Sequence, residues 1–483
     1  MTPEIRRVAN FILLMFLSLF VAASTLQVVN ADSLNNDSRN QRAVYDGYKT
    51  QRGAILVNNK PIAESIKTAD AYRYLRKYTG EQYSAITGFY SLFQGRTGLE
   101  SVLDSSLRGD NSAAFFEQLN ALLSGNPVSG ASVELTIDED VQLAAWKALG
   151  SMKGAVVAIE PATGRILALV SKSGFDANLL STHNTNNAYE NYKSLLTNKN
   201  APLVNRAIGG DLYAPGSVFK LVVAAAAFES GNYTPQSKLP NPAKFILPGT
   251  TTAITNSGEG RCGGATTVSI ATALKLSCNI PFAQLGIALG QDAIAEQAKA
   301  FGFGESISIP LKSTASVYPE NLDAAQTALT AFGQFDVRVS PLQMAMVSAS
   351  IANAGIEMKP YLVQQIFTSN LTVLEEGKPI EIGRSITTST AERLKSMMIA
   401  AVSSGVSSNA RIPGVKVAGK TGTAENGVSD PYTLWFTGFA PADNPQVAVA
   451  VVVEDGGGKG QSGRGNTLAA PIAKKVMEAV LSK

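Results

Sequence analysis

A serine and a lysine lie three residues apart at the start of an apolar run. Ser217 and Lys220 follow Pro215-Gly216, and the residues from Leu221 to Phe228 are all apolar. Pro and Gly end an irregular segment, so the run predicts a buried helix that Gly231 would end. Residues three apart share a helix face, and the free N–H groups of the first turn favour negative charge. We therefore expect Ser217 to be an acylated nucleophile and Lys220 to be its base.

The composition disfavours several rival chemistries. The chain has a single histidine, His183, which lies in a polar stretch rich in Asn and Thr, and it has two cysteines. A Ser-His-Asp triad needs a histidine beside the serine, and zinc is usually bound by several His or Cys ligands. We therefore expect no metal and no other cofactor. A net charge of +3, with no basic stripe, likewise does not predict nucleic-acid binding.

The amino terminus predicts a membrane anchor. Arg6 and Arg7 precede an apolar stretch from Phe11 to Ala23, which continues more weakly to Val29. Basic residues before such a stretch place the short tail in the cytoplasm and the rest of the chain outside. A cleaved signal peptide is the alternative, but its apolar region would be shorter and Ala22-Ala23-Ser24 is a poor cleavage site. In either case the catalytic part would act outside the cytoplasmic membrane.

Two further short motifs follow Ser217 in order. Ser277-Cys278-Asn279 ends a helical stretch, and Lys420-Thr421-Gly422-Thr423 lies in a predicted strand. Each motif is weak alone, because Ser407-Ser408-Asn409 also fits the Ser-x-Asn pattern and Lys172-Ser173-Gly174 nearly fits the Lys-Thr-Gly pattern. The order of the three motifs, and the elements that carry them, indicate one site.

The apolar pattern predicts an α+β fold. Two apolar strands, 154–160 and 164–170, flank a Pro/Gly turn, and strand patterns return between Gly414 and Glu454. Residues 171–203 are expected to be a long polar connection, and the apolar spacing after the Ser217 helix is mostly helical through Ser404. A closing amphipathic helix is expected from about Leu468 to Leu481. These elements predict one antiparallel sheet, completed by the two ends of the chain, beside a helical lobe.

Together the three motifs resemble the active-site motifs of the serine acyltransferases that bind penicillin. Further segments resemble the class B penicillin-binding proteins, namely Arg52 to Ile55, Gly154 to Ile159, Ser340 to Ala345 and Gly419 to Ala424. The resemblance spans essentially the whole chain and implies the penicillin-binding transpeptidase fold, which is similar to that of serine β-lactamases. It also implies a tail and anchor in 1–30, a β-rich, non-catalytic pedestal or dimerisation domain in 31–150, and a transpeptidase domain in 151–483.

The resemblance implies a peptidoglycan D,D-transpeptidase that acts in cell-wall synthesis during growth or division. Ser217 would attack a stem peptide ending in D-Ala-D-Ala, and the amine of a neighbouring stem would resolve the acyl-enzyme. β-Lactams would be trapped at the first step. A D,D-carboxypeptidase and a non-catalytic β-lactam sensor or scaffold are the alternatives. A polytopic peptidoglycan glycosyltransferase and division or elongation proteins are the expected protein partners.

Each motif residue can be given a physical role. A lysine of ordinary pKa is protonated at neutral pH, but burial and a second ammonium, Lys420, would lower the pKa of Lys220. Ser277 could relay a proton between Lys220 and the leaving or incoming amine. Asn279, with both a donor and an acceptor, could orient Lys220 and a substrate amide.

The third motif is expected to bind the substrate's free carboxylate. Thr421 and Thr423 alternate along a strand, so both hydroxyls face one side and form a donor cluster with Lys420. Gly422 has no side chain, which lets a ligand or another backbone approach closely. The backbone N–H groups of Ser217 and Thr423 are the candidates for the oxyanion hole.

The two cysteines, Cys262 and Cys278, form the only pair in the chain. Outside the membrane disulfides persist, so we expect the pair to be bridged, which would stabilise the fold by roughly 3 kcal/mol. Two free thiols are the alternative.

Overall fold

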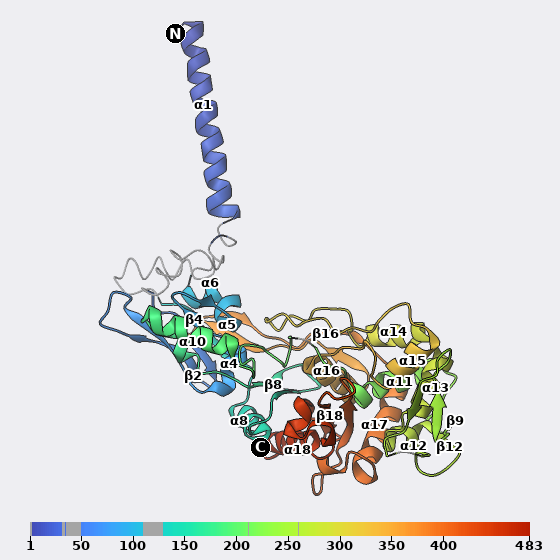
Figure 1. The fold of residues 1–483 in the computed structure, drawn as a ribbon. Coiled ribbons are helices and arrows are strands. Elements are labelled where there is room, and N and C mark those ends of the chain that lie inside the picture. Colours follow the sequence, from blue (N-terminus) through green and yellow to red (C-terminus); the bar gives the residue numbers. More distant parts are fainter. Residues whose placement is uncertain (1, 31–33, 35–49, 110–128, 211, 259) are drawn as a thin grey trace.

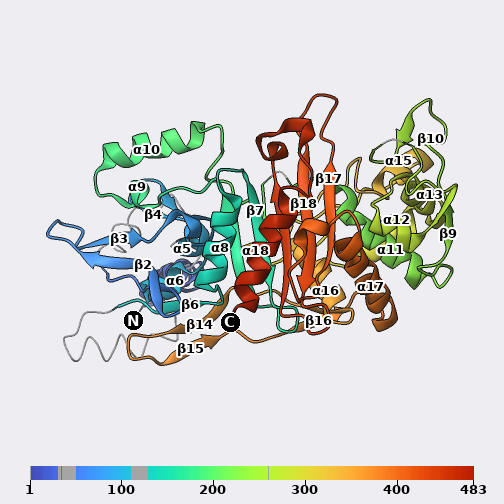
Figure 2. The ribbon, with the colours of Figure 1, turned by 90° about the horizontal axis from the view of Figure 1, so that it is seen from below.

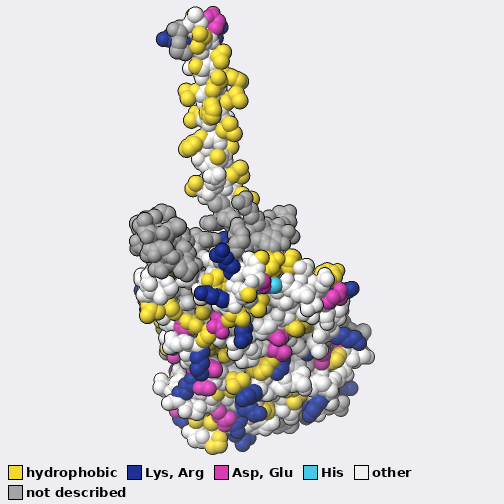
Figure 3. Space-filling model, turned by 90° about the vertical axis from the view of Figure 1, so that its left-hand side faces the viewer, with side chains coloured by type: hydrophobic (Ala, Val, Ile, Leu, Met, Phe, Trp, Pro, Cys, Tyr) yellow, Lys and Arg dark blue, Asp and Glu magenta, His cyan; other side chains and the backbone are white. Residues whose placement is uncertain are grey.

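The computed structural model describes residues 2–30, 34, 50–109, 129–210, 212–258 and 260–483. The chain begins with helix α1 (Pro3–Ser24), which a π-helical segment over Thr25–Val29 continues. α1 projects away from the rest of the molecule, and none of its residues is buried (Figure 1). Apolar side chains cover it (Figure 3). Over Pro3–Val29 this helix is long and apolar enough to cross a membrane.

The amino-terminal part contains a six-stranded sheet in the order β15-β14-β6-β1-β2-β3. Strands β1 and β2 form a hairpin around Asn58 and Asn59, whose φ angles of 50° and 60° suit a tight turn. Strands β14 and β15 come from far along the sequence; β14 pairs with β6, and β15 pairs with β14 at the edge of the sheet (Figure 2). The strands are β1 (Ile55–Val57), β2 (Lys60–Lys67), β3 (Tyr74–Tyr78), β6 (Ser132–Leu135), β14 (Val363–Phe367) and β15 (Val373–Glu376).

Short elements pack beside this sheet. They are the 3-10 helix η2 (Glu81–Tyr83), helices α4 (Ser84–Thr87), α5 (Gly98–Val102) and α6 (Asp104–Arg108), and strands β4 (Tyr90–Ser91) and β5 (Gly95–Arg96). Helices α9 (Asn178–Ser181) and α10 (Thr185–Thr197) lie on the same side of the molecule (Figure 2).

A buried cluster of charges joins these elements. Glu100 accepts hydrogen bonds from Arg52 Nε and Arg76 Nε, each at 2.6 Å, and Arg52 Nη1 also contacts Asp104 at 2.6 Å. All four side chains are almost completely buried. Burial alone would raise the pKa of Glu100, but Arg76 and Arg52 hold it below its ordinary value. The cluster therefore ties the segment before β1 to β3, α5 and α6.

The second part is built on a five-stranded antiparallel sheet in the order β17-β18-β19-β7-β8. The prediction of one sheet formed from segments far apart in the sequence is confirmed. The strands are β7 (Gly154–Ile159), β8 (Ile166–Lys172), β17 (Ala418–Ala424), β18 (Thr433–Ala440) and β19 (Val447–Val453).

Helices cover both faces of this sheet. α8 (Glu139–Leu149), capped by Asp138, and the closing helix α18 (Ala469–Leu481) pack on one face, and α16 (Pro341–Ala352) packs on the other (Figure 2). Every residue of β7, β18 and β19 is buried. Coverage of both faces explains why these strands are continuous apolar runs instead of alternating patterns.

The helical lobe lies beyond β17. Its helices are the 3-10 helix η4 (Gly216–Phe219), α11 (Lys220–Glu229), α12 (Ile270–Lys275), α13 (Ile280–Leu289), α14 (Gln291–Ala300), α15 (Ala324–Thr330) and α17 (Thr388–Ser404). Short strands connect them: β9 (Lys238–Pro240), β10 (Lys244–Ile246), β11 (Ala253–Thr255), β12 (Thr267–Ser269), β13 (Ile356–Met358) and β16 (Glu381–Arg384). Three 3-10 turns, η5 (Ser408–Ala410), η6 (Asp455–Gly458) and η7 (Gly460–Ser462), complete this part.

Two expectations about secondary structure need correction. Residues 171–203 are not simply a polar connection, because they contain α9 and α10. The segment 356–384, within the stretch of mostly helical spacing, contains the strands β13 to β16. α10 is mostly exposed, and these strands are three to five residues long. Neither feature leaves a strong periodic apolar pattern.

The buried charge cluster yields a stability prediction. Glu100→Gln would leave two buried guanidinium groups without their shared carboxylate, and should lower the free energy of unfolding by about 3–5 kcal/mol. Calorimetric melting of the purified protein measures the loss. The matched control is Glu139→Gln, which breaks an exposed pair with Lys60 and should change the melting temperature little. Equal effects of the two substitutions would contradict a stabilising role for the cluster.

Candidate active site

Ser217 lies on a tight turn that leads into a buried helix. It belongs to the 3-10 helix η4, and α11 begins at Lys220, one turn later. In a 3-10 helix, side chains three residues apart are eclipsed, so Ser217 and Lys220 point to the same side. Ser217 is half-buried, whereas Lys220 is completely buried. The expected helix is therefore present, with a tighter first turn than an α-helix, and it ends just before Gly231, whose φ is +74°.

The amine of Lys220 is held by two acceptors from the second motif. Its Nζ donates to Ser277 O at 2.8 Å and to Asn279 Oδ1 at 2.9 Å. The Asn279 amide is oriented for this by its own Nδ2, which donates to Thr255 O. A neutral amine has two N–H bonds and one lone pair, so these two acceptors use both N–H bonds. The lone pair is then left to accept a proton from a third group.

Both lysines of the site have lowered pKa values. Burial, together with the neighbouring Lys420 ammonium, holds the pKa of Lys220 well below its ordinary value. Burial also lowers the pKa of Lys420 to about 7. Both shifts favour the neutral amine, and the Lys420 ammonium disfavours the charge of Lys220 further.

Ser277 connects the two lysines. Its hydroxyl accepts a hydrogen bond from Lys420 Nζ at 2.8 Å, whereas Lys220 contacts its carbonyl oxygen. Its φ is +59°, a left-handed conformation that costs a residue with a Cβ roughly 1–2 kcal/mol. This conformation follows the end of α12 and allows one residue to present its carbonyl to one amine and its hydroxyl to the other. Strained residues of this kind cluster at functional sites.

The third motif lies on β17, an edge strand of the five-stranded sheet. Thr421 is buried, and its hydroxyl lies 3.2 Å from Ser407 Oγ; its backbone N–H donates to the same oxygen at 3.1 Å. Ser407 is thus a site-supporting residue that sequence reasoning missed. It belongs to Ser407-Ser408-Asn409, which looked like a chance repeat of the second motif. The sequence feature that could have identified Ser407 was this second match to the Ser-x-Asn pattern, shortly before β17.

The outward edge of β17 faces the Ser217 turn. Because Thr421 N–H points away from β18, the N–H of Thr423, two residues on, points to the same open edge. A Cβ placed on Gly216 would lie only 2.7 Å from Thr423 O, so the two segments are in contact. The N–H groups of Ser217 and Thr423, the expected oxyanion hole, are therefore on segments that touch.

Two glycines permit this close approach. Gly216 has a φ of +54° and, as described, no room for a Cβ. A Cβ on Gly422 would lie 2.9 Å from Pro215 O. Trp435 Nε1 donates to Ala214 O at 3.0 Å and fixes the same turn from β18, so Trp435 is a buried part of the wall.

A disulfide bond and the side chain of Asn256 hold the second motif in place. Cys278 is bridged to Cys262 with a Cα–Cα distance of 5.8 Å. Asn256 Oδ1 accepts hydrogen bonds from the backbone N–H groups of Asn279 and Ile280, at 2.9 and 3.1 Å. The loop that contains Cys262 and the start of α13 are therefore joined directly at the motif.

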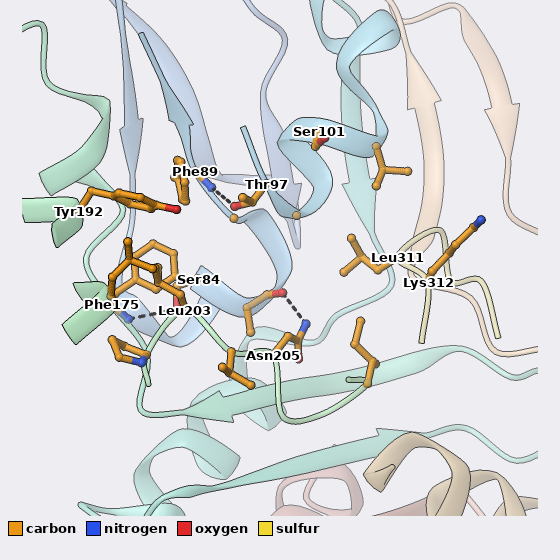
Figure 4. A pocket seen from close by; sticks show the side chains of 18 residues that line it. Ser84, Phe89, Thr97, Ser101, Phe175, Tyr192, Leu203, Asn205, Leu311 and Lys312 are labelled. Atoms are coloured by element: carbon orange, nitrogen blue, oxygen red, sulfur yellow. Dashed lines mark hydrogen bonds between the residues drawn. The ribbon is translucent and has the colours of Figure 1, made fainter. Parts of the chain in front are cut away.

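The single histidine and one large cavity lie away from the residues of the three motifs. His183 contacts Asp70 and Tyr74 O in the amino-terminal part. A cavity of about 490 Å³ lies where the two parts meet (Figure 4). Beside it, Asn205 Nδ2 donates to Ala85 O at 2.8 Å and Phe175 N–H donates to Ser84 Oγ at 3.3 Å. None of the residues expected to be catalytic lines it.

Comparison with protein families gives two matches. Residues 154–478 match the model described as the penicillin-binding protein transpeptidase domain. Residues 52–133 match that of the penicillin-binding protein A dimerisation domain.

Similar proteins point to the same family. The chain is 40% identical to the peptidoglycan D,D-transpeptidase PbpA of Mycolicibacterium smegmatis, with 100% of this chain and 99% of the relative covered. It is 39% identical to the protein of the same name from Mycobacterium tuberculosis, with the same coverage. Among solved structures it is similar to the ceftriaxone acyl-enzyme complex of penicillin-binding protein A from M. tuberculosis, with a TM-score of 0.88 and 39% identity, covering 90% of this chain and 100% of that one.

The expected antiparallel sheet, the helical lobe beside it and the amino-terminal sheet all occur in one chain whose full length aligns with these relatives. The chain belongs to the class B penicillin-binding protein family and has the family's transpeptidase fold.

Proposed function

We propose that the chain is a peptidoglycan D,D-transpeptidase in which Ser217 is acylated by a stem peptide and Lys220 is the base. The observation that carries the proposal is the setting of Lys220. Its amine is completely buried, and both N–H bonds of its neutral form are used by Ser277 and Asn279. The neutral amine that remains can accept the proton of a hydroxyl one helical turn before it.

The reaction proceeds in two halves. Ser217 Oγ attacks the penultimate D-Ala carbonyl and transfers its proton to Lys220. The tetrahedral oxyanion is stabilised by the backbone N–H groups of Ser217 and Thr423, and one such donor is worth roughly 3–4 kcal/mol. The proton then passes to the departing D-Ala amine. The side-chain amine of a second stem then attacks the acyl carbon, its proton returns through Lys220 to Ser217 Oγ as the ester bond breaks, and the cross-linked product leaves.

The third motif binds the carboxyl terminus of the donor. Lys420 supplies the charge, and the Thr421 and Thr423 hydroxyls supply donors; the buried Thr421 hydroxyl is oriented by Ser407 Oγ, 3.2 Å away. Ser277 is the proton relay between Lys220 and the leaving or incoming amine; its carbonyl oxygen accepts from Lys220 Nζ and its Oγ accepts from Lys420 Nζ. β-Lactams carry a carboxylate beside a strained amide, so they enter the same site and stay bound to Ser217.

The amino-terminal helix supports a position of this site at the membrane. α1 is the anchor, with Arg6 and Arg7 on the cytoplasmic side and the catalytic part outside, on the basis of charge and apolar length. Residues 31–150 form the non-catalytic pedestal and 151–483 the transpeptidase domain. The pedestal engages a polytopic peptidoglycan glycosyltransferase and division or elongation proteins.

The nucleophile is tested by the mass of the intact protein. Wild-type protein incubated with benzylpenicillin should gain one penicillin per chain, and Ser217→Ala should gain none because the attacking hydroxyl is gone. Ser403→Ala, which removes an exposed hydroxyl on α17, is the matched control and should label as wild type does. A label that survives Ser217→Ala would remove the assignment.

The acceptor is tested by product analysis. With a D-Ala-D-Ala donor and an added acceptor amine, the protein should form the cross-linked amide in preference to the hydrolysed donor. A carboxypeptidase would form the hydrolysed donor whether or not the amine was present.

The pKa values of the two lysines predict a bell-shaped pH profile for acylation. The rate should rise with pH through the low pKa of Lys220, which must be neutral to act as a base. It should fall above about pH 7, where Lys420 loses the charge that binds the carboxylate. Stopped-flow acylation by benzylpenicillin measures both limbs. The methyl ester of the same penicillin lacks the carboxylate and should not show the falling limb; persistence of that limb with the ester would contradict the role of Lys420.

A further inference from the structure

A cavity of about 510 Å³ lies between the amino-terminal sheet and the turns and helices of the five-stranded sheet. Its walls come from the β1–β2 turn, β6 and β14 on one side, and from the β7–β8 turn, α8 and the end of α18 on the other. Figure 2 shows the carboxyl terminus of the chain beside β14, where these walls meet. No residue of the three motifs lines this cavity, and the proposed mechanism does not use it.

One side of the cavity carries a buried carboxylate. Glu134, on β6, is 8% exposed, and its Oε1 accepts a hydrogen bond from Asn59 N–H at 3.1 Å. Its Oε2 is also buried, and within the described residues this oxygen has no hydrogen-bond partner. Burial raises the pKa of Glu134 above its ordinary value, which the backbone N–H groups of Asn59 and Asn58 offset in part. A cationic donor against Oε2 would satisfy the oxygen and favour the charged form.

The other side of the cavity carries a guanidinium. Arg165 lies at the end of the β7–β8 turn, where its N–H donates to Thr163 Oγ1 at 3.2 Å and its carbonyl oxygen accepts from Glu160 N–H at 2.9 Å. Its Nε is buried and, among the residues that the structure describes, has no hydrogen-bond partner. Two opposite charges therefore line one cavity, and the unpartnered atoms of Glu134 and Arg165 do not contact each other.

The other acidic residues of the cavity have partners. Asp138 Oδ1 accepts from the N–H groups of the first turn of α8 at 3.1 and 3.2 Å, and its Oδ2 pairs with Lys483. Glu160 accepts a hydrogen bond from the Thr163 hydroxyl. An uncompensated buried charge is costly, so Glu134 and Arg165 are the groups at which a ligand gains most.

We propose that this cavity binds a small zwitterion, a free amino acid or a short peptide, with its carboxylate on the Arg165 guanidinium and its ammonium group on Glu134 Oε2. A guanidinium binds a carboxylate through parallel N–H bonds, and a carboxylate accepts strong hydrogen bonds from an ammonium group. A ligand with neutral ends would leave both buried charges uncompensated. Gln364 and Gln446 line the same cavity, and their amides can bond the peptide groups of a longer ligand, which favours the short peptide.

The position of the two charges gives the ligand a structural effect. Glu134 belongs to the amino-terminal sheet, and Arg165 belongs to a turn of the five-stranded sheet. A ligand bound to both joins the two parts of the molecule, so binding should raise the melting temperature of the protein. The inference does not rest on the proposed function.

The test uses triglycine and measures its binding to the full-length protein in detergent by isothermal titration calorimetry. Two blocked forms, N-acetyltriglycine and triglycinamide, lack the ammonium group and the carboxylate, respectively. Each should bind at least about tenfold more weakly than triglycine, the scale of one hydrogen bond to a charged group. Glycine is the second probe, and binding as tight as that of triglycine would support the site and assign it to a free amino acid.

Two variants test the two charges separately. Glu134→Gln should bring the affinity ratio of triglycine to N-acetyltriglycine to about one and should leave the ratio of triglycine to triglycinamide largely unchanged. Arg165→Ala should do the reverse, and Arg165→Lys should retain part of the carboxylate preference. A substitution that only disturbed folding would not separate the two ratios. The matched controls are Glu190→Gln and Arg73→Ala, at exposed positions outside the cavity, which should keep both ratios as in wild type.

Equal binding of triglycine and its two blocked forms would overturn the inference, as would wild-type ratios in both variants. No binding of glycine or triglycine at millimolar concentration would also overturn it. The titration is repeated on protein acylated with benzylpenicillin, and binding that acylation abolishes would assign the ligand to the Ser217 site and overturn the inference. Failure of the proposed function is a separate result, in which benzylpenicillin would not acylate the wild-type protein while triglycine would still bind.

Discussion

The buried amine of Lys220 is the interaction on which the site depends. An ammonium without a carboxylate partner is costly to bury, and here a second amine, Lys420, lies close enough to disfavour the charge further. The fold satisfies the neutral form instead, with one acceptor from a backbone carbonyl and one from an amide side chain. Ser277 and Asn279 are held for this by α12, α13 and Asn256. A large part of the helical lobe therefore favours the neutral form of Lys220 Nζ.

The second constraint is the contact between the Ser217 turn and the edge of β17. In the proposed mechanism the scissile carbonyl accepts hydrogen bonds from both segments, and their backbones approach more closely than a Cβ would allow. Gly216 and Gly422 permit that approach, and Trp435 fixes its position from the neighbouring strand. The same edge is closed at one side by Ser407 and at the other by Gln334. The length of strand open to a peptide is therefore short, and it lies beside the nucleophile.

Much of this arrangement could be predicted from the sequence, for physical reasons. The apolar runs of β7, β18 and β19 and the continuous apolar helix after Ser217 have unambiguous patterns because they are buried on all sides. The three motifs could be placed because a helix or strand determines which side chains share a face. Ser407 and Gln334 could not be placed, since their roles depend on backbone groups that lie far away in the sequence. The helices in 171–203 and the strands in 356–384 were missed because they are exposed or short.

The hairpin β14–β15 has a consequence for biogenesis. Because a chain is synthesised from its amino terminus, β6 emerges long before β14, which covers its free edge. Until it arrives, an unpaired strand edge is open to other chains, as on an amyloid-forming protein. A fragment truncated after the first sheet segments would keep that edge permanently, so the chain has to be completed through β14 before its amino-terminal sheet is protected from self-association.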